Sequence, residues 1–238
     1  MSTPTDLVAA APAARDAAVT GICNDSRQAR DGDLFICKGY GFKPEYLAMA
    51  RRQGAVCALA ETDFPGVDIP CIRVTDVRKA QSLAARWFYD NPSDGLTLIG
   101  VTGTKGKTTT THMIKSVLEA AGRKVGMIGT NGIYFLGHHQ ETANTTPESY
   151  ELQKTFREFL DAGCDTALME VSSQGLMMDR VAGIHYDVGV FTNLSPDHIG
   201  PGEHKTFEEY RSWKGQLFKR CDVGVVNIDD ENTEALLE

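Results

Sequence analysis

The six cysteines of this 238-residue sequence include no C-x-x-C pair. Several stand in apolar runs such as LFICKG and AVCALA, which is typical of buried free thiols in a reducing compartment. The sequence also lacks any run of about 18 apolar residues that could cross a membrane. Its first residues, MSTPTDLVAAAPAARDAAV, lack the basic start and apolar core of an export signal. These absences predict a soluble cytoplasmic protein with no membrane insertion.

Positive charge is also in short supply. Lysine and arginine total 24 against 32 aspartate and glutamate residues, which gives a net charge of −8, and no basic block or stripe appears. Nucleic acid is therefore excluded as the main partner, because phosphate backbones are bound by clustered lysine and arginine. Any phosphate group that this protein binds must be bound at one local site.

The sequence shows no internal repeat, and its only biased tract is the alanine-rich start, which we expect to be a loose lead-in or a short helix. Hydrophobic residues make up 42% of the chain, enough for the cores of one large or two modest domains. Up to about residue 92 the strands and helices are short, and DNPSDG at 90–95 has the turn chemistry of a linker. We predict a small α/β domain at 1–94 and a second domain at 95–238.

From residue 96 onward, predicted strands and helices alternate strictly. Continuous apolar strands that alternate with helices indicate a parallel sheet covered on both faces, with ligands at the carboxyl ends of the strands. The predicted strands are LTLIGVTG, KVGMIGT, DTALMEVSS, VGVFTNL and VGVVNID, and the predicted helices span 106–121, 148–162 and 206–219. The strand ends then hold residues 103–108, 130–131, 170–173 and 192–198.

The stretch VTGTKGKTTTT joins the first of these strands to a helix. Gly103 and Gly106 let the backbone turn its N–H groups inward, and the helix start adds more, which makes an anion cradle. Lys107 would then reach the β- and γ-phosphates of a nucleotide, and Thr108 would offer its hydroxyl to Mg²⁺, as in a P-loop. The usual P-loop pattern has glycine where Val101 stands. The alternative is a glycine-rich turn with a solvated lysine.

Two further side chains at strand ends are candidate metal ligands. Glu170 closes an apolar strand, where a partly buried carboxylate is costly unless it meets a cation such as Mg²⁺. Its alternative role is to cap the following turn. His198 could ligate a second metal ion or contact phosphate, and its alternative is an ordinary solvated loop histidine.

Six blocks together resemble one family: DSRQARDGDLFICKG, GVTGTKGKTTTTHMI, ANTTPES, MEVSSQGLMMDRV, FTNLSPDHI and YRSWKGQLF. They are similar to the Mur ligases, and among these to the MurE type. The resemblance implies an ATP- and Mg²⁺-dependent amide ligase. Such an enzyme adds a third amino acid, meso-diaminopimelate or L-lysine, to UDP-MurNAc-L-Ala-D-Glu through an acyl phosphate. It implies a UDP-binding domain, a P-loop ATPase domain that is incomplete here, and a third domain for the amino acid. The fragment is therefore expected to be inactive alone, and monomeric.

The resemblance also implies roles for individual residues. For uracil it implies Ser26, with Tyr40, Gly41 and Phe42 as a second segment. For ATP it implies Gly103, Thr104, Lys105, Gly106, Lys107, Thr108 and Thr109, with Asn193 at the adenine edge. For the muramoyl-dipeptide it implies Asn144, Thr145, Thr146, Ser172 and Arg180, whereas Met178 replaces a polar contact of some relatives. For metal it implies Thr108, Glu170, His198 and Lys214 as a carbamate, and for catalysis Lys107, Glu170, His198 and Lys214.

Two other functions stay open. A related ligase such as folylpolyglutamate synthase or cyanophycin synthetase shares the P-loop, although DSRQARDGDLF favours a UDP-sugar domain in front of it. A P-loop binding module or regulatory ATPase would have no ligase chemistry. Binding of UDP would separate the last alternative from the others, since such a module has no reason to recognise uridine.

Overall fold

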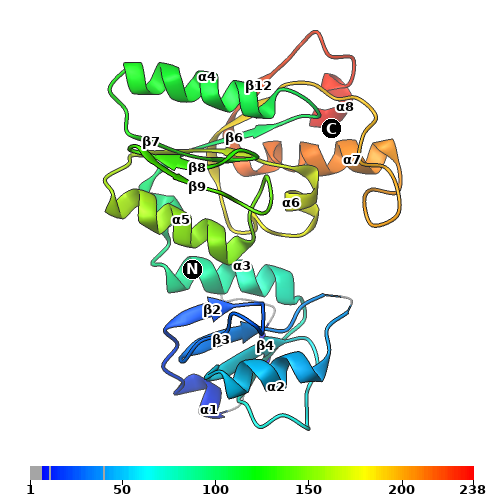
Figure 1. Cartoon of the computed structure of the whole chain (residues 1–238). Coiled ribbons are helices and arrows are strands. Elements are labelled where there is room, and N and C mark those ends of the chain that lie inside the picture. Colours follow the sequence, from blue (N-terminus) through cyan, green and yellow to red (C-terminus); the bar gives the residue numbers. More distant parts are fainter. Residues whose placement is uncertain (1–6, 11, 40) are drawn as a thin grey trace. The chain divides into compact units, whose positions relative to one another are not determined.

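A computed structural model describes residues 7–10, 12–39 and 41–238. The chain divides into two compact units, Met1–Ala85 and Arg86–Glu238, each built around its own sheet (Figure 1). Helix α3 (Val77–Phe88) runs across this division, which falls before the boundary predicted at residue 94. Within the described residues, no helix is both long enough and apolar enough to span a bilayer.

Unit 1 is a small α/β domain of five strands and the helices α1 (Pro12–Arg15), α2 (Pro44–Arg52) and α3. Four of its strands are parallel, namely β2 (Gly21–Cys23), β3 (Asp33–Ile36), β4 (Cys57–Ala60) and β5 (Cys71–Val74), and β1 (Leu7–Ala10) pairs antiparallel with β5. The start of the chain was predicted as a lead-in or short helix, so α1 is confirmed, but the strand β1 was missed. The sheet order is β1 (Leu7–Ala10), β5 (Cys71–Val74), β4 (Cys57–Ala60), β3 (Asp33–Ile36), β2 (Gly21–Cys23).

Unit 2 contains a seven-stranded sheet whose first five strands in spatial order are parallel. The predicted strict alternation is wrong at one place, because β8 (Gly132–Phe135) and β9 (His138–Gln140) form an antiparallel hairpin beside β7 (Val125–Gly129). The sheet order is β12 (Cys221–Val226), β11 (Tyr186–Phe191), β6 (Thr97–Thr102), β10 (Thr166–Glu170), β7 (Val125–Gly129), β8 (Gly132–Phe135), β9 (His138–Gln140).

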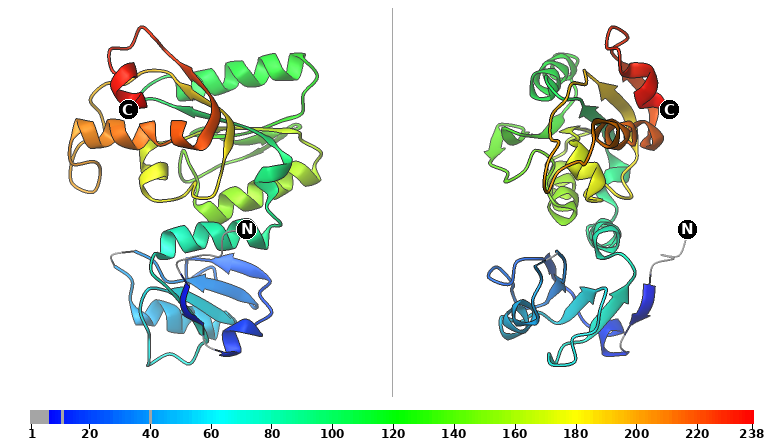
Figure 2. Two further views of the ribbon diagram at one scale, coloured as in Figure 1. Left: turned by 180° about the vertical axis from the view of Figure 1, so that it is seen from behind. Right: turned by 90° about the vertical axis from the view of Figure 1, so that its right-hand side faces the viewer.

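Helices cover both faces of this sheet (Figure 2). The helices predicted at 106–121, 148–162 and 206–219 correspond to α4 (Lys107–Ala120), α5 (Ser149–Asp161) and α7 (Phe207–Gly215), whereas the short helices α6 (Ser173–Met177) and α8 (Thr233–Leu237) were not predicted. Two 3₁₀ turns, Pro92–Gly95 and Phe218–Arg220, complete the unit.

Neighbouring residues of β6 belong to two different apolar cores, as the period of a strand requires. Leu98 packs with Phe156 and Phe159 of α5, whereas Ile99 packs on the other face with Ile114 of α4. Gly126 of β7 lies under α5, where an added Cβ would come 2.2 Å from the Phe159 ring. The sheet therefore separates two cores, and its carboxyl edge lies between them.

Leu136 stands at the tip of the β8–β9 hairpin with a backbone φ of +46°, and Gly137 follows with a φ of +86°. These are the angles of a type I′ turn, which asparagine tolerates far better than leucine. Leu136 is also 47% exposed, so its side chain gains little from burial. Leu136→Asn should therefore raise the free energy of unfolding by about 1 kcal/mol in urea denaturation. Leu136→Ala keeps the strain and is the matched control; an equal gain from alanine would contradict this explanation.

Candidate functional site

The P-loop connects β6 to α4, and two of its glycines hold conformations that other residues rarely adopt. Gly103 has a φ of +146°, and a Cβ there would lie 2.0 Å from the Thr192 hydroxyl. Gly106 caps the start of α4 with a φ of +81°. Val101, which replaces the first glycine of the usual pattern, lies fully buried inside β6 and before the loop begins. The departure from the pattern therefore leaves the cradle itself intact.

Hydrogen bonds from the segment after β11 hold the loop in place. Thr104 donates its backbone N–H to the Asn193 carbonyl over 2.8 Å. The Asn193 side chain accepts from the Lys105 N–H and donates to the Lys105 carbonyl, each over 3.0 Å. Tyr210 of α7, which the sequence did not suggest, places its hydroxyl 3.1 Å from Thr104 Oγ1. In this structure the Asn193 side chain thus supports the loop; a contact with adenine stays a prediction.

Two lysines donate to the same backbone carbonyl. Lys107 Nζ lies 2.9 Å and Lys214 Nζ 2.8 Å from the oxygen of Gly103, and Lys107 also reaches the Thr104 carbonyl over 3.2 Å. Lys214 is 1% exposed and sits 4.5 Å above the centre of the Tyr210 ring. Burial lowers the pKa of Lys107, while the nearby charge of Glu170 partly opposes that shift. Burial and then the charge of Lys107 hold the pKa of Lys214 well below its ordinary 10.5.

This lowered pKa predicts a pH dependence of stability. Unfolding exposes Lys214, which then takes up a proton, so the free energy of unfolding should rise with pH between the lowered pKa and 10.5. The slope from one group is at most about 1.4 kcal/mol per pH unit. Lys214→Met should remove this contribution and raise stability at neutral pH, because no buried amine remains. Urea denaturation at several pH values measures both; an unchanged slope in the variant would contradict the assignment.

Glu170 ends β10 as a carboxylate that is only 1% exposed. It accepts hydrogen bonds from the Thr108 hydroxyl over 3.0 Å, the Thr130 N–H over 2.9 Å and the Thr130 hydroxyl over 3.1 Å. All three donors are neutral, and the turn that follows is capped by Ser172 instead. A buried carboxylate beside a threonine hydroxyl matches the oxygen ligands that Mg²⁺ prefers. Thr108 and Glu170 therefore fit the ion.

A cavity of about 240 Å³ opens beside the P-loop lysine. His198 lines it with a backbone φ of +53°, and its Nδ1 lies 2.9 Å from Glu203 Oε1. In the described part of the chain, no cluster of three His, Cys, Asp or Glu side chains could hold a metal, so His198 as a metal ligand stays a prediction. The lining consists of Lys107, Ala143, Asn144, Thr145, Thr146, Ser172, Ser173, Gln174, Arg180 and His198. All five residues predicted for the dipeptide are in this set; Ala143, Ser173 and Gln174 were not predicted.

Arg180 and Thr146 form the polar wall of this cavity. Thr146 donates to the Glu170 carbonyl over 3.0 Å and accepts from the Ser172 N–H over 2.9 Å. Arg180 donates to the Thr146 carbonyl over 3.0 Å and pairs with Glu148 at 3.2 Å, while its Nε is buried without a partner among the described residues. Among the described residues, Met178 accepts a hydrogen bond on its sulfur from Arg180 at 3.8 Å. The wall thus holds a buried guanidinium that can bind an anion.

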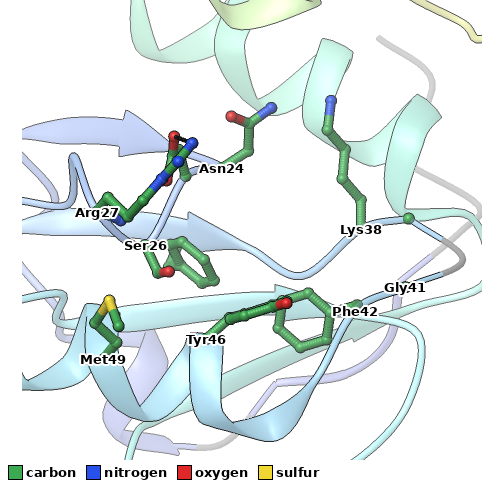
Figure 3. A pocket seen from close by; sticks show the side chains of 11 residues that line it. Asn24, Ser26, Arg27, Lys38, Gly41, Phe42, Tyr46 and Met49 are labelled. Carbon is green, nitrogen blue, oxygen red and sulfur yellow. Dashed lines mark hydrogen bonds and ion pairs between the residues drawn. The ribbon is translucent and has the colours of Figure 1, made fainter.

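Unit 1 contains a larger cavity, of about 660 Å³, at the carboxyl ends of β2 and β3 (Figure 3). Ser26, Gly41 and Phe42, predicted for uracil, line this cavity, and their contact with uracil stays a prediction; Tyr40 lies outside the described residues. Figure 3 shows the rings of Phe42 and Tyr46 close together, and polar side chains above them. The lining residues that the sequence did not suggest are Asn24, Asp25, Arg27, Phe35, Lys38, Gly39, Tyr46 and Met49. Several of them directly follow β2 or β3. The expectation that ligands bind at the carboxyl ends of parallel strands could therefore have found them.

Comparison with known proteins gives consistent matches. The family model described as the Mur ligase middle domain matches residues 101–238. A UDP-N-acetylmuramoyl-L-alanyl-D-glutamate–2,6-diaminopimelate ligase of Clostridium botulinum is 43% identical over 220 residues, 90% of this chain and 45% of that protein. The ligase of the same name from Bacillus velezensis is 45% identical over 227 residues, 91% of this chain and 46% of that protein.

A solved structure of a ligase of that name superimposes with a TM-score of 0.80 at 29% identity. The match covers 92% of this chain and 45% of the solved chain. The chain thus spans about half the length of the curated relatives it matches.

Proposed function

Because this chain belongs to the Mur ligase family, we propose that it forms the UDP-sugar-binding and ATP-binding parts of an amide ligase. The ligase would join diaminopimelate, or in the alternative L-lysine, to the D-glutamate of UDP-MurNAc-L-Ala-D-Glu in peptidoglycan synthesis. The names of the relatives support the first amino acid. The same proposal includes a cytoplasmic location, where the nucleotide substrate is made, and a monomer.

The observation that carries the proposal is the position of Lys107. It starts α4 in the P-loop, and it also lines the cavity that contains Arg180. A nucleotide phosphate in the cradle and a carboxylate in the cavity would therefore meet at one ammonium group. That is what formation of an acyl phosphate requires, because the carboxylate must attack the terminal phosphate and both carry negative charge.

The chain's own residues supply binding and charge compensation. The loop N–H groups and Lys107 would bind the β- and γ-phosphates and stabilise the charge that develops as phosphate is transferred. Arg180 would orient the D-glutamate carboxylate. Once that carboxylate is phosphorylated, the amine of the incoming amino acid would attack its carbonyl carbon, form the C–N bond, expel inorganic phosphate and lose a proton. Mg²⁺, held by Thr108 and Glu170, would supply further positive charge at the phosphates. Lys214 would serve as an additional anionic ligand once its amine has added CO₂ and lost a proton.

Binding of UDP to residues 1–238 tests the proposal against the alternative of a regulatory ATPase. Ser26 is 7% exposed and lines the large cavity of unit 1. Ser26→Ala should weaken UDP binding in calorimetry by about tenfold, the effect of losing one hydrogen bond. Ser93→Ala is the matched control, because its buried hydroxyl lies in unit 2 and has no partner among the described residues. A chain that binds ATP but not UDP would contradict the ligase.

A further inference from the structure

Ser173 and His204 form a buried pair that none of the predicted roles includes. His204 lies in the segment between β11 and α7 and is 0% exposed. Its Nε2 stands 2.8 Å from the Ser173 hydroxyl. Its Nδ1 is buried with no partner among the described residues. A fully buried imidazole that makes one side-chain hydrogen bond, and makes it to a cavity-lining serine, needs an explanation.

The backbone holds His204 in this position. Its N–H donates to the His198 carbonyl, and its carbonyl accepts from the Gly200 N–H, each over 3.1 Å. The ring also packs 5.3 Å from the ring of Tyr210, which is itself fully buried. The backbone hydrogen bonds and the contact with Tyr210 therefore hold the imidazole where Nε2 meets Ser173.

The choice of tautomer decides what the serine can do. At neutral pH an imidazole is mostly uncharged, so one ring nitrogen carries the proton. A proton on Nδ1 would leave a buried N–H without an acceptor, which is rarer and costlier in proteins than an unused acceptor. The proton therefore belongs on Nε2, which donates to Ser173 Oγ. The hydroxyl proton of Ser173 is then left for another acceptor.

Among the described residues, none supplies an acceptor for that proton. Ser173 lines the cavity with Lys107 and Arg180, and its hydroxyl makes no further hydrogen bond in the described part of the chain. The neighbouring Ser172 differs, because its hydroxyl accepts from the Gly175 N–H over 3.0 Å and caps α6. The hydroxyl of Ser172 thus completes the fold by capping α6, whereas the contact of the Ser173 hydroxyl among the described residues is with His204.

We propose that Ser173 donates a hydrogen bond to a carboxylate of the D-glutamate in the ligand, and that His204 is the positioning residue that keeps this hydroxyl a donor. Ser173 would act beside Lys107 and Arg180, so the cavity would combine two cations with one neutral directional donor. The assignment rests on the proposed function, since it names a group of that substrate. It adds two residues that set the preference for a carboxylate.

Calorimetry on residues 1–238 with UDP and with UDP-MurNAc-L-Ala-D-Glu tests the assignment. Ser173→Ala and His204→Leu should each weaken binding of the dipeptide ligand by about tenfold or more, and leave UDP binding unchanged. His204→Gln should restore most of the affinity, because its amide can donate to Ser173. The double variant Ser173→Ala/His204→Leu should be no weaker than Ser173→Ala alone, since His204 acts through the serine.

The outcomes separate this inference from the function on which it rests. Should His204→Leu fail to fold, Ser173→Ala and His204→Gln still decide the question. Suppose that the wild-type chain binds the dipeptide ligand more tightly than UDP, and that Ser173→Ala binds the dipeptide ligand as tightly as the wild type. This result would overturn the role of Ser173 and His204 and leave the proposed function standing. Equal affinity of the wild-type chain for both ligands would overturn that role together with the proposed dipeptide site.

Discussion

Replacing Lys107 with alanine should weaken the binding of ATP·Mg²⁺ to this chain by about ten- to a hundredfold, because one charge-assisted contact to the phosphates is lost. Among the described residues the Lys107 ammonium donates to two carbonyls of its own loop, Gly103 and Thr104. Without nucleotide, the lysine therefore bonds carbonyls of the loop, while the charge of the buried Glu170 offsets part of the cost of burying its ammonium group. Its removal should cost little stability, and the loss should appear in calorimetry and not in urea denaturation.

Lys115→Ala is the control for this experiment. Lys115 belongs to the same helix α4 and pairs with Glu119 at 2.6 Å, one turn along the helix. The control removes the same charge but no group of the P-loop, so ATP affinity should stay within about twofold. Losing the exposed pair should cost only about 0.3–0.5 kcal/mol of stability, so this variant should also stay folded. Equal losses in both variants would show that net charge decides binding, and would remove the P-loop assignment of Lys107.

Glu170→Gln should abolish the gain in ATP affinity that Mg²⁺ provides. The wild-type chain should bind ATP at least about tenfold more tightly with Mg²⁺ than with EDTA, which corresponds to about 1.4 kcal/mol. Glutamine keeps the shape and can still accept from Thr108 and the Thr130 N–H, while its amide donates to the Thr130 hydroxyl. Only the charge is lost, so the variant should bind ATP equally with and without the ion.

The stability of Glu170→Gln provides a second measurement. A buried carboxylate with neutral donors is costly, so its neutral isostere should leave the free energy of unfolding unchanged or raise it. Glu119→Gln, at an exposed position of α4, is the matched charge control and should keep the response to Mg²⁺. A persistent Mg²⁺ effect in Glu170→Gln would show that the ion binds elsewhere.

Local sequence patterns predicted most of the sheet in unit 2. Apolar runs such as LTLIGVTG mark strands buried on both faces, and each helix between them repeats its apolar residues with the helical period. The P-loop could be predicted for the same reason, since its glycines and Lys107 are consecutive in the chain. Thr108 and Glu170 follow or end neighbouring parallel strands, and the structure brings them together as the carboxyl ends of such strands predict. Their roles as Mg²⁺ ligands stay predictions.

The features that the sequence could not predict depend on contacts between distant segments. The hairpin β8–β9 has leucine where a type I′ turn favours asparagine, so no turn signal marked it. Tyr210 and His204 gain their roles only because α7 and the segment before it pack beside the P-loop and α6. Nothing in the local pattern of either residue distinguishes it from an ordinary buried side chain.

The position of β6 between β10 and β11 has a consequence for how the protein folds. The Leu98 N–H is satisfied by Asp187, 89 residues away, and Thr108 meets Glu170 across 62 residues. Loops of that length must close before either contact can form, which slows folding. The strand that carries the phosphate cradle therefore receives its neighbours late, and a newly made chain should gain the capacity to bind nucleotide as one of the last events of folding.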